Sequence, residues 1–118
     1  MDEDVTTQKR SAHFGALNNA DGRARITGPC GDTMEFWLAV DAGGRVTKVG
    51  FTTDGCGSSV ICGEAACRIA EGALIKVVRR LEQADVLALA RGVPDEHRHC
   101  ALLAANTLKQ AVRSVRGT

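Results

Sequence analysis

The chain has 118 residues, an ordinary apolar fraction of 44% and a formal net charge of +1. This length predicts one domain with a single core, and so small a net charge gives no reason to expect nucleic-acid binding. No apolar run approaches the length of a membrane span. The first ten residues, MDEDVTTQKR, lack the apolar segment of a signal peptide. We therefore expect a cytoplasmic protein that binds neither nucleic acid nor membrane.

The N-terminal half predicts a small antiparallel sheet after a flexible lead-in over residues 1–12. A short extended candidate covers 21–28, and 45–53 forms the partner of a strand at 33–41 across the turn signal AGG. The apolar residues of the central strand alternate with the others, as in a half-buried strand; they are Met34, Phe36, Leu38 and Val40. The alternation slips between Val46 and Val49, which indicates a bulge.

After Cys56 the chain becomes rich in alanine and predicts helices. One helix is expected over 58–72, two short helices over 73–81 and 83–91, and a long amphipathic helix from His99 to about Arg116. Strands followed by helices predict an α+β fold, in which a small antiparallel sheet of about three strands packs against helices. The rest of the chain, 13–118, is expected to form this one domain.

Helical periodicity sorts several side chains by face. Cys62 shares a face with small apolar residues and is predicted to lie in the core. Cys67 shares another face with Glu64 and Glu71 and is predicted to lie nearer solvent. The last helix presents an apolar side, with Leu108, Val112 and Val115. Its other side is basic, with Lys109, Arg113 and Arg116, and we interpret this basic side as a solvated face.

Five cysteines in a cytoplasmic protein favour metal binding or thiol chemistry over disulfides, and the sequence contains no CxxC pair. Three short segments at the ends of predicted elements hold the candidate ligands. They are Cys30 and Asp32 in GPCGD (28–32), Cys56 in DGCGSS (54–59), and His97, His99 and Cys100 in HRHC (97–100). Thiols with a carboxylate and an imidazole suit a tetrahedral site for zinc or an iron–sulfur centre.

Cys56 and Asp32 each allow two interpretations. Cys56 stands between two glycines, and Ser58 or Ser59 is expected to cap the following helix. A thiol beside the positive end of a helix dipole is placed as a metal ligand or nucleophile; the alternative is a small residue in a tight turn. Asp32 adds a harder donor, which suits a site that releases its cargo, whereas the alternative is that it caps a turn.

Three stretches resemble the signatures of the IscU/NifU-type iron–sulfur cluster scaffold family: GPCGDTMEFWLAVD, FTTDGCGSS and the His-Cys pair of RHCALLA. The resemblance runs from about Asn18 to Val115, with 26 positions from Cys30 to Cys56 and 44 from Cys56 to Cys100. The family fold is also a small antiparallel sheet with helices, in agreement with the pattern of strands and helices.

The resemblance implies that Cys30, Cys56 and Cys100 bind a transient [2Fe–2S] cluster, and that Asp32 makes this cluster labile. It implies that His99 is an alternative ligand to iron or to zinc. Cys100 would accept persulfide sulfur from a cysteine desulfurase, with its thiolate favoured by the N-terminus of the last helix. The implied partners are this desulfurase, a ferredoxin-like electron donor and apo iron–sulfur proteins; the implied protein is a carrier and not an enzyme.

The sequence departs from the family at three places. Housekeeping members carry Leu-Pro-Pro-Val-Lys before the His-Cys pair, where this chain has VPDEHR (93–98), so transfer by a dedicated Hsp70-type chaperone is not expected. The family's Asn-Pro-Arg-Asn element is replaced by HFGALNNADG (13–22). Cys62 and Cys67 stand where many relatives have small residues or serine.

Two other functions would use the same residues. A zinc-bound sulfur acceptor, similar to the SufU branch of the superfamily, would use Cys100 for sulfur, but SufU-type chains carry an insertion between the second and third cysteines that this chain lacks. A Cys–His hydrolase would pair Cys100 with His97 or His99. Adjacent residues of a helix do not face each other, which argues against His99 as the base.

Overall fold

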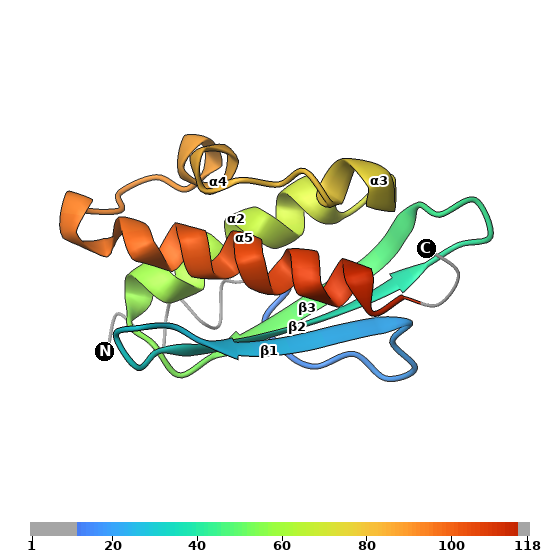
Figure 1. Ribbon diagram of the computed structural model, residues 1–118, viewed down its shortest axis with the longest axis horizontal. Helices are drawn as coiled ribbons and strands as arrows, with labels where there is room; N and C mark the ends of the chain where they lie inside the picture. The colour runs from blue at the N-terminus through green and yellow to red at the C-terminus, as the bar shows by residue number, and fades with distance from the viewer. Residues whose placement is uncertain (1–11, 116–118) are drawn as a thin grey trace.

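The computed structural model describes residues 12–115 (Figure 1). The strands come first: β1 (Gly22–Thr27), β2 (Thr33–Val40) and β3 (Val46–Thr53). The helices follow: α2 (Gly57–Ala70), α3 (Ile75–Val78), α4 (Gln83–Leu89), the 3₁₀ turn η1 (Asp95–His97) and α5 (Arg98–Arg113). The predicted α+β class is confirmed, with three antiparallel strands and a long C-terminal helix. The expected lead-in lies outside the described residues except for its last position.

The elements form three layers (Figure 1). The sheet is one layer, α2 and α5 cover one of its faces, and α3 with α4 lie on the far side of these two helices. The main core fills the space between the sheet and the α2–α5 layer, where apolar burial supplies most of the stabilising free energy. Its largest fully buried side chains include Phe36, Phe51, Met34, Leu38 and Leu108. The apolar side predicted for the last helix is buried as expected.

The sheet has the order β1-β2-β3, with β2 paired to both neighbours in antiparallel register. The register with β3 shifts between Ala39 and Val40: Ala39 pairs with Lys48, whereas Val40 pairs with Val46. Thr47 is therefore the extra residue of a bulge. The bulge predicted between Val46 and Val49 is confirmed.

The outer face of the sheet is partly covered by the segment that precedes β1. A Cβ atom built on Gly50 would lie 2.4 Å from the carbonyl oxygen of Gly15, so the segment crosses β3 where a side chain is absent. Trp37, the cross-strand partner of Gly50, is 8% exposed although it points away from the main core. The Arg23 guanidinium lies 5.6 Å from the Trp37 ring centroid, a cation–π contact.

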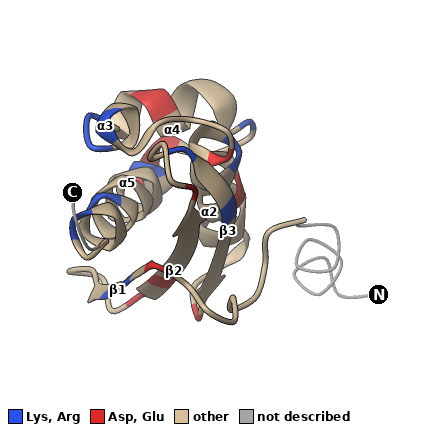
Figure 2. Cartoon of the chain, turned by 90° about the vertical axis from the view of Figure 1, so that its right-hand side faces the viewer, with Lys and Arg blue, Asp and Glu red and all other residues tan. Residues whose placement is uncertain are grey.

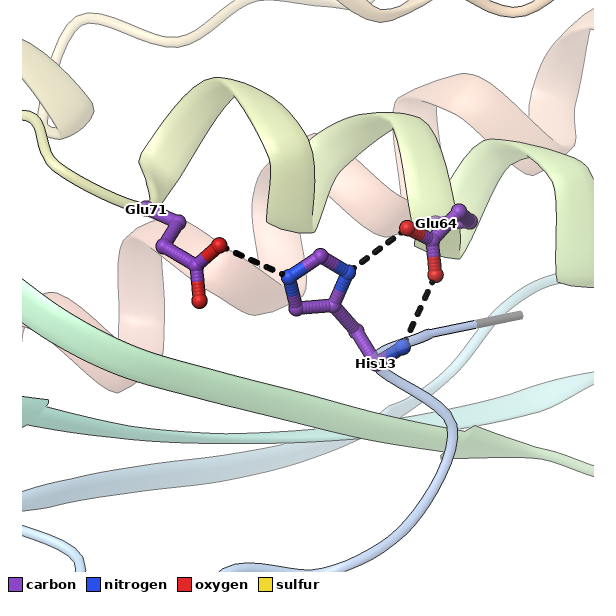
Figure 3. A network of polar contacts seen from close by, with 3 residues as sticks. All are labelled: His13, Glu64 and Glu71. Carbon is purple, nitrogen blue, oxygen red and sulfur yellow. Dashed lines mark hydrogen bonds and ion pairs between the residues drawn. The ribbon is translucent and has the colours of Figure 1, made fainter.

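His13 fastens this segment to α2 (Figure 3). Its Nδ1 lies 2.6 Å from Glu64 Oε2, its Nε2 lies 3.2 Å from Glu71 Oε1, and its backbone N–H donates to Glu64 Oε1. We call these three residues the His13 clamp. Burial lowers the pKa of His13, but the hydrogen bonds and charges of the two glutamates outweigh it, so the pKa is raised. The next residue, Phe14, bridges to Phe51 of β3.

The prediction that Cys67 lies nearer solvent is wrong, because its side chain is fully buried. Cys67 does share a helical face with Glu64 and Glu71, but the His13 clamp spans that face. Helix periodicity shows which residues share a face and not what covers it. Burial raises the pKa of the Cys67 thiol well above its usual range, and the two glutamate charges add to this effect.

Charged residues of both signs are interspersed over the helices and the sheet (Figure 2), in keeping with the small net charge. In the basic stripe of α5, Arg113 is exposed and Lys109 is half-buried, while Arg116 lies outside the described residues. No helix within residues 12–115 is long and apolar enough to cross a bilayer.

Candidate metal centre

Three segments far apart in the sequence meet at one end of the molecule, on the left in Figure 1. They are the β1–β2 loop (28–32), the β3–α2 connection (54–56) and the N-terminal end of α5. The first two are joined by two hydrogen bonds, one to a side chain and one between backbone groups: Thr33 N–H donates to Asp54 Oδ1 at 2.7 Å, and Asp54 N–H donates to the Thr33 carbonyl at 3.3 Å. The topology thus brings every predicted ligand-bearing segment to the same place.

The β1–β2 loop holds Cys30 at its tip. Gly28 N–H donates to the Asp32 carbonyl at 2.8 Å and Gly31 N–H donates to the Gly28 carbonyl at 3.0 Å, which closes a tight hairpin turn. Gly31 has φ = +92°, a conformation that favours glycine. The turn leaves the Cys30 thiol exposed, and the Asp32 side chain, at the start of β2, is half-buried.

The structure brings Cys30, Asp32 and His99 together. One donor atom from each of these residues lies within 4.8 Å of the other two, and this is the one such group of three His, Cys, Asp or Glu residues within 12–115. Sulfur, carboxylate oxygen and imidazole nitrogen are donors that zinc and iron accept. The residues present therefore fit a transition metal, with one donor harder than the others.

Cys100 lies next to this group but inside the protein, at 1% exposure. Its Sγ is 3.7 Å from His99 Nε2, so the expectation that these adjacent side chains do not meet is wrong. Both residues stand in the first turn of α5, and the imidazole of His99 lies against the thiol of the next residue. Burial raises the pKa of the Cys100 thiol, against the expectation that the helix N-terminus favours its thiolate.

Further groups act on the same thiol. The hydrogen bond with Ser59 lowers the Cys100 pKa, whereas the charges of Cys56, Asp32 and Cys30 raise it. The net direction is upward. A buried thiol with a raised pKa is a poor nucleophile, which also argues against a Cys–His hydrolase.

Cys56 reaches the same end of the molecule without joining the three-donor group. It is the N-cap residue of α2 and its thiol is exposed. Its carbonyl accepts the N–H of Ser59 at 2.9 Å and that of Val60 at 3.3 Å. The helix N-terminus predicted after this residue is therefore present, and the thiol faces solvent beside the donor group.

The expectation that Ser58 or Ser59 caps α2 is wrong, because the α2 cap makes no side-chain hydrogen bond. Ser58 Oγ instead lies 2.9 Å from His97 Nδ1. Ser59 Oγ donates to Asp32 Oδ2 at 3.3 Å and lies 3.4 Å from Cys100 Sγ. His97 therefore sits beside the site through Ser58, outside the donor group. The clue in the sequence was two consecutive hydroxyls directly after a candidate ligand.

The structure explains why glycine stands at position 55, directly before Cys56. A Cβ atom at this position would lie 2.3 Å from Ser59 Oγ and 2.9 Å from Asp32 Oδ2. Distances this short require the neighbours to move. Glycine at position 55 therefore makes room for the approach of Asp32 to Ser59.

Cys62 lies in the core as predicted, at 0% exposure. Burial raises the pKa of its thiol to about 12, with smaller contributions from Cys100 and Cys56. A groove of about 750 Å³ lies elsewhere, between α2, α3 and α4, and none of its lining residues is a candidate ligand. The candidate ligands are thus confined to the end of the molecule where the β1–β2 loop, the β3–α2 connection and the start of α5 meet.

Comparison with known proteins defines the class. The family model for the NifU-like N-terminal domain matches residues 6–118, and the chain belongs to this family. It is 31% identical over 103 residues to the iron–sulfur cluster assembly scaffold protein IscU of Aquifex aeolicus, covering 86% of this chain and 66% of the relative. It is 29% identical over 101 residues to scaffold protein IscU 1 of Archaeoglobus fulgidus, covering 85% of this chain and 65% of the relative.

Two further matches set the scale of the resemblance. The nitrogen fixation protein NifU of Azotobacter chroococcum is 30% identical over 119 residues, covering 94% of this chain but 38% of that protein. This chain thus spans two thirds or less of these relatives' lengths. The N-terminal structure of a NifU-like protein from Brucella abortus superposes with a TM-score of 0.69 at 16% identity, covering 98% of this chain and 92% of that one. That similarity concerns the fold alone.

Proposed function

We propose that this protein is a scaffold on which a [2Fe–2S] cluster is assembled from iron and desulfurase-derived sulfur and then transferred to apo-proteins. The observation that carries the proposal is the group of Cys30, Asp32 and His99, with Cys56 and Cys100 at the same end of the fold. The names of the Aquifex and Archaeoglobus relatives, iron–sulfur cluster assembly scaffold proteins, support the same function.

In this proposal the cluster is cargo, and the five candidate ligand side chains have different roles. Thiolates are the usual ligands of iron–sulfur clusters, a part we assign to Cys30, Cys56 and Cys100. Asp32 supplies the weaker oxygen ligand that makes the cluster releasable. His99 holds iron before Cys100 becomes free to bind it. Cys30 and Cys56 are exposed, so cargo reaches them from solvent.

Sulfur arrives at Cys100. Its thiolate attacks the outer sulfur of a desulfurase persulfide, forms a new S–S bond and releases the desulfurase thiolate. Electrons from a ferredoxin-like donor then cleave this bond, giving sulfide and restoring the Cys100 thiolate. Because Cys100 is 1% exposed, delivery requires the groups that cover its thiol to move aside. We propose that this carrier works in the cytoplasm, performs no turnover of a small molecule, and does not use a dedicated Hsp70-type chaperone.

Anaerobic reconstitution with iron, cysteine and a cysteine desulfurase tests the proposal, read out by ultraviolet–visible spectra and by iron and sulfide content. We expect [2Fe–2S] absorption in the wild-type protein and its loss in Cys30→Ala and Cys56→Ala. Cys62→Ala is the matched control, because it removes a thiol buried in the core and should keep the absorption. No absorption in the wild-type protein, or its loss in the control alone, would reject the scaffold.

A zinc-bound sulfur acceptor is the second candidate. It is favoured by the donor atoms of Cys30, Asp32 and His99, which already lie together without Cys56 and form a set that zinc takes. The two functions differ in what the purified protein does with desulfurase and no iron. A colourless protein that keeps zinc and still accumulates persulfide on Cys100 would favour the sulfur acceptor. Persulfide transfer is measured by mass spectrometry after alkylation, with Cys100→Ala as the control.

A further inference from the structure

Ser59 joins two candidate ligands that come from opposite halves of the chain. Its hydroxyl donates to Asp32 Oδ2 at 3.3 Å and hydrogen-bonds to Cys100 Sγ at 3.4 Å. Asp32 precedes β2 and Cys100 stands in α5, so no local structure holds the two together. Ser59 itself is 0% exposed. Buried polar groups in folded proteins nearly always form hydrogen bonds, as this hydroxyl does.

The surroundings leave space for the Ser59 hydroxyl beside Asp32 and Cys100. Ser59 stands in the first turn of α2, where its N–H is bonded to the Cys56 carbonyl. On its other side Gly55 has no side chain, and a Cβ there would lie 2.3 Å from Ser59 Oγ. The absence of a side chain at Gly55 therefore leaves the space in which the Ser59 hydroxyl contacts Asp32 and Cys100. A serine hydroxyl has one hydrogen to donate and lone pairs that accept, so it can bond to a carboxylate, to a protonated thiol or to a thiolate.

We propose that Ser59 is a positioning residue, whose hydroxyl holds Asp32 and Cys100 in place before iron or zinc binds. The inference rests on the proposed function, since it assigns these two residues to the metal site. Side chains that hold metal ligands by hydrogen bonds contribute to affinity although they never touch the metal. Without the hydroxyl, neither Asp32 nor Cys100 is held by Ser59, so the metal site is less preorganised.

Anaerobic titration with Co²⁺ tests this proposal, because thiolate–cobalt charge-transfer and d–d bands report the ligand set directly. For Ser59→Ala we expect a cobalt affinity lower by about tenfold, within the range for such supporting residues, and shifted d–d bands. Alanine is smaller than serine and favours helix, so circular dichroism should show an intact fold. Thr107→Val is the matched control: it removes a buried hydroxyl, bonded to the Leu103 carbonyl, away from the site.

A double-mutant cycle with Asp32→Ala separates positioning from simple destabilisation. If Ser59 acts through Asp32, the effect of Ser59→Ala on cobalt affinity should shrink markedly in the Asp32→Ala background. Unchanged affinity and bands in Ser59→Ala, or a loss equal to that of Thr107→Val, would overturn the role of Ser59 and leave the scaffold function intact. A wild-type protein that gives no charge-transfer bands with cobalt would overturn both.

Discussion

Asp32 places an oxygen donor among sulfur and nitrogen donors, and its consequence should be visible in the lifetime of the loaded protein. In Asp32→Ala, we expect the reconstituted cluster to decay more slowly in air than in the wild-type protein, by several-fold. The reason is that a carboxylate holds iron less tightly than thiolate and yields its position to solvent or to an acceptor. Decay is followed by the loss of visible absorption.

The control for this change is Asp95→Ala, which removes an exposed carboxylate from η1, outside the donor group. Its cluster should decay at the wild-type rate. Equal lifetimes for Asp32→Ala and the wild-type protein would show that the carboxylate does not govern release. In that case the turn-capping interpretation of Asp32 would be preferred.

Individual residues show where inference from the sequence succeeds and where it stops. Cys30, Cys56 and Cys100 could be singled out because each stands at the end of a predicted element, flanked by glycine or histidine. Ser59 could not, since its partners are 27 and 41 positions away. A pattern of residues indicates local structure, whereas a hydrogen bond between distant segments depends on the completed fold.

The His13 clamp makes the attachment of the segment before β1 to α2 depend on pH. A raised pKa in the folded state means that the protonated histidine stabilises the fold. This contribution is complete below the unfolded pKa, near 6.5, and is lost as the pH rises through the raised folded value. The groups that face the imidazole are Glu64 and Glu71, with the Cys67 thiol on the same helical face.

We therefore expect His13→Gln to unfold more easily than the wild-type protein at pH 6 and to approach it at alkaline pH. Urea unfolding at a series of pH values measures this difference in the free energy of unfolding. Glu71→Gln, which removes the negative charge from the longer of the two contacts, at 3.2 Å, should show a smaller change of the same sign. A difference between wild type and His13→Gln that is constant with pH would contradict a charged clamp.

The elements within residues 12–115 were largely predictable, including the three strands, the bulge in β3 and the helices α2 to α5. Alternation and helical periodicity are local properties, so they place Met34, Phe36 and Leu38 inside correctly. The burial of Cys67 and Trp37 was not predictable in this way. His13 binds two glutamates on the helical face of Cys67, and the segment 13–17 crosses Gly50, the strand partner of Trp37; both are tertiary contacts.

At the scale of the whole molecule, metal binding at one end should stabilise the entire fold. A ligand that binds the folded state alone adds about 2.7 kcal/mol when its free concentration is about 100 times its Kd. We expect zinc to raise the thermal unfolding temperature, and a chelator to reverse this increase. Cys30→Ala should lose the shift, whereas Cys62→Ala, a change in the core, should keep it.

Hydrogen exchange locates the same effect. Zinc should slow exchange most in 28–32, in 54–59 and at the start of α5, the three segments that carry the donors, and least in α3 and α4, which form the outermost layer. A chain that shows no change in unfolding temperature with zinc, or protection confined to α3 and α4, would contradict a metal centre at this end.

The unequal exposure of the three candidate ligand thiols has a consequence for survival in an oxidising environment. Cys30 and Cys56 face solvent while Cys100 is 1% exposed. Peroxide therefore reaches the outer pair first, and at those positions the early oxidation products can be returned to thiol by cellular reductants. Cys100, to which we assign sulfur capture, is protected from peroxide by its burial. Its irreversible oxidation should therefore occur mainly when the groups that cover its thiol have moved aside.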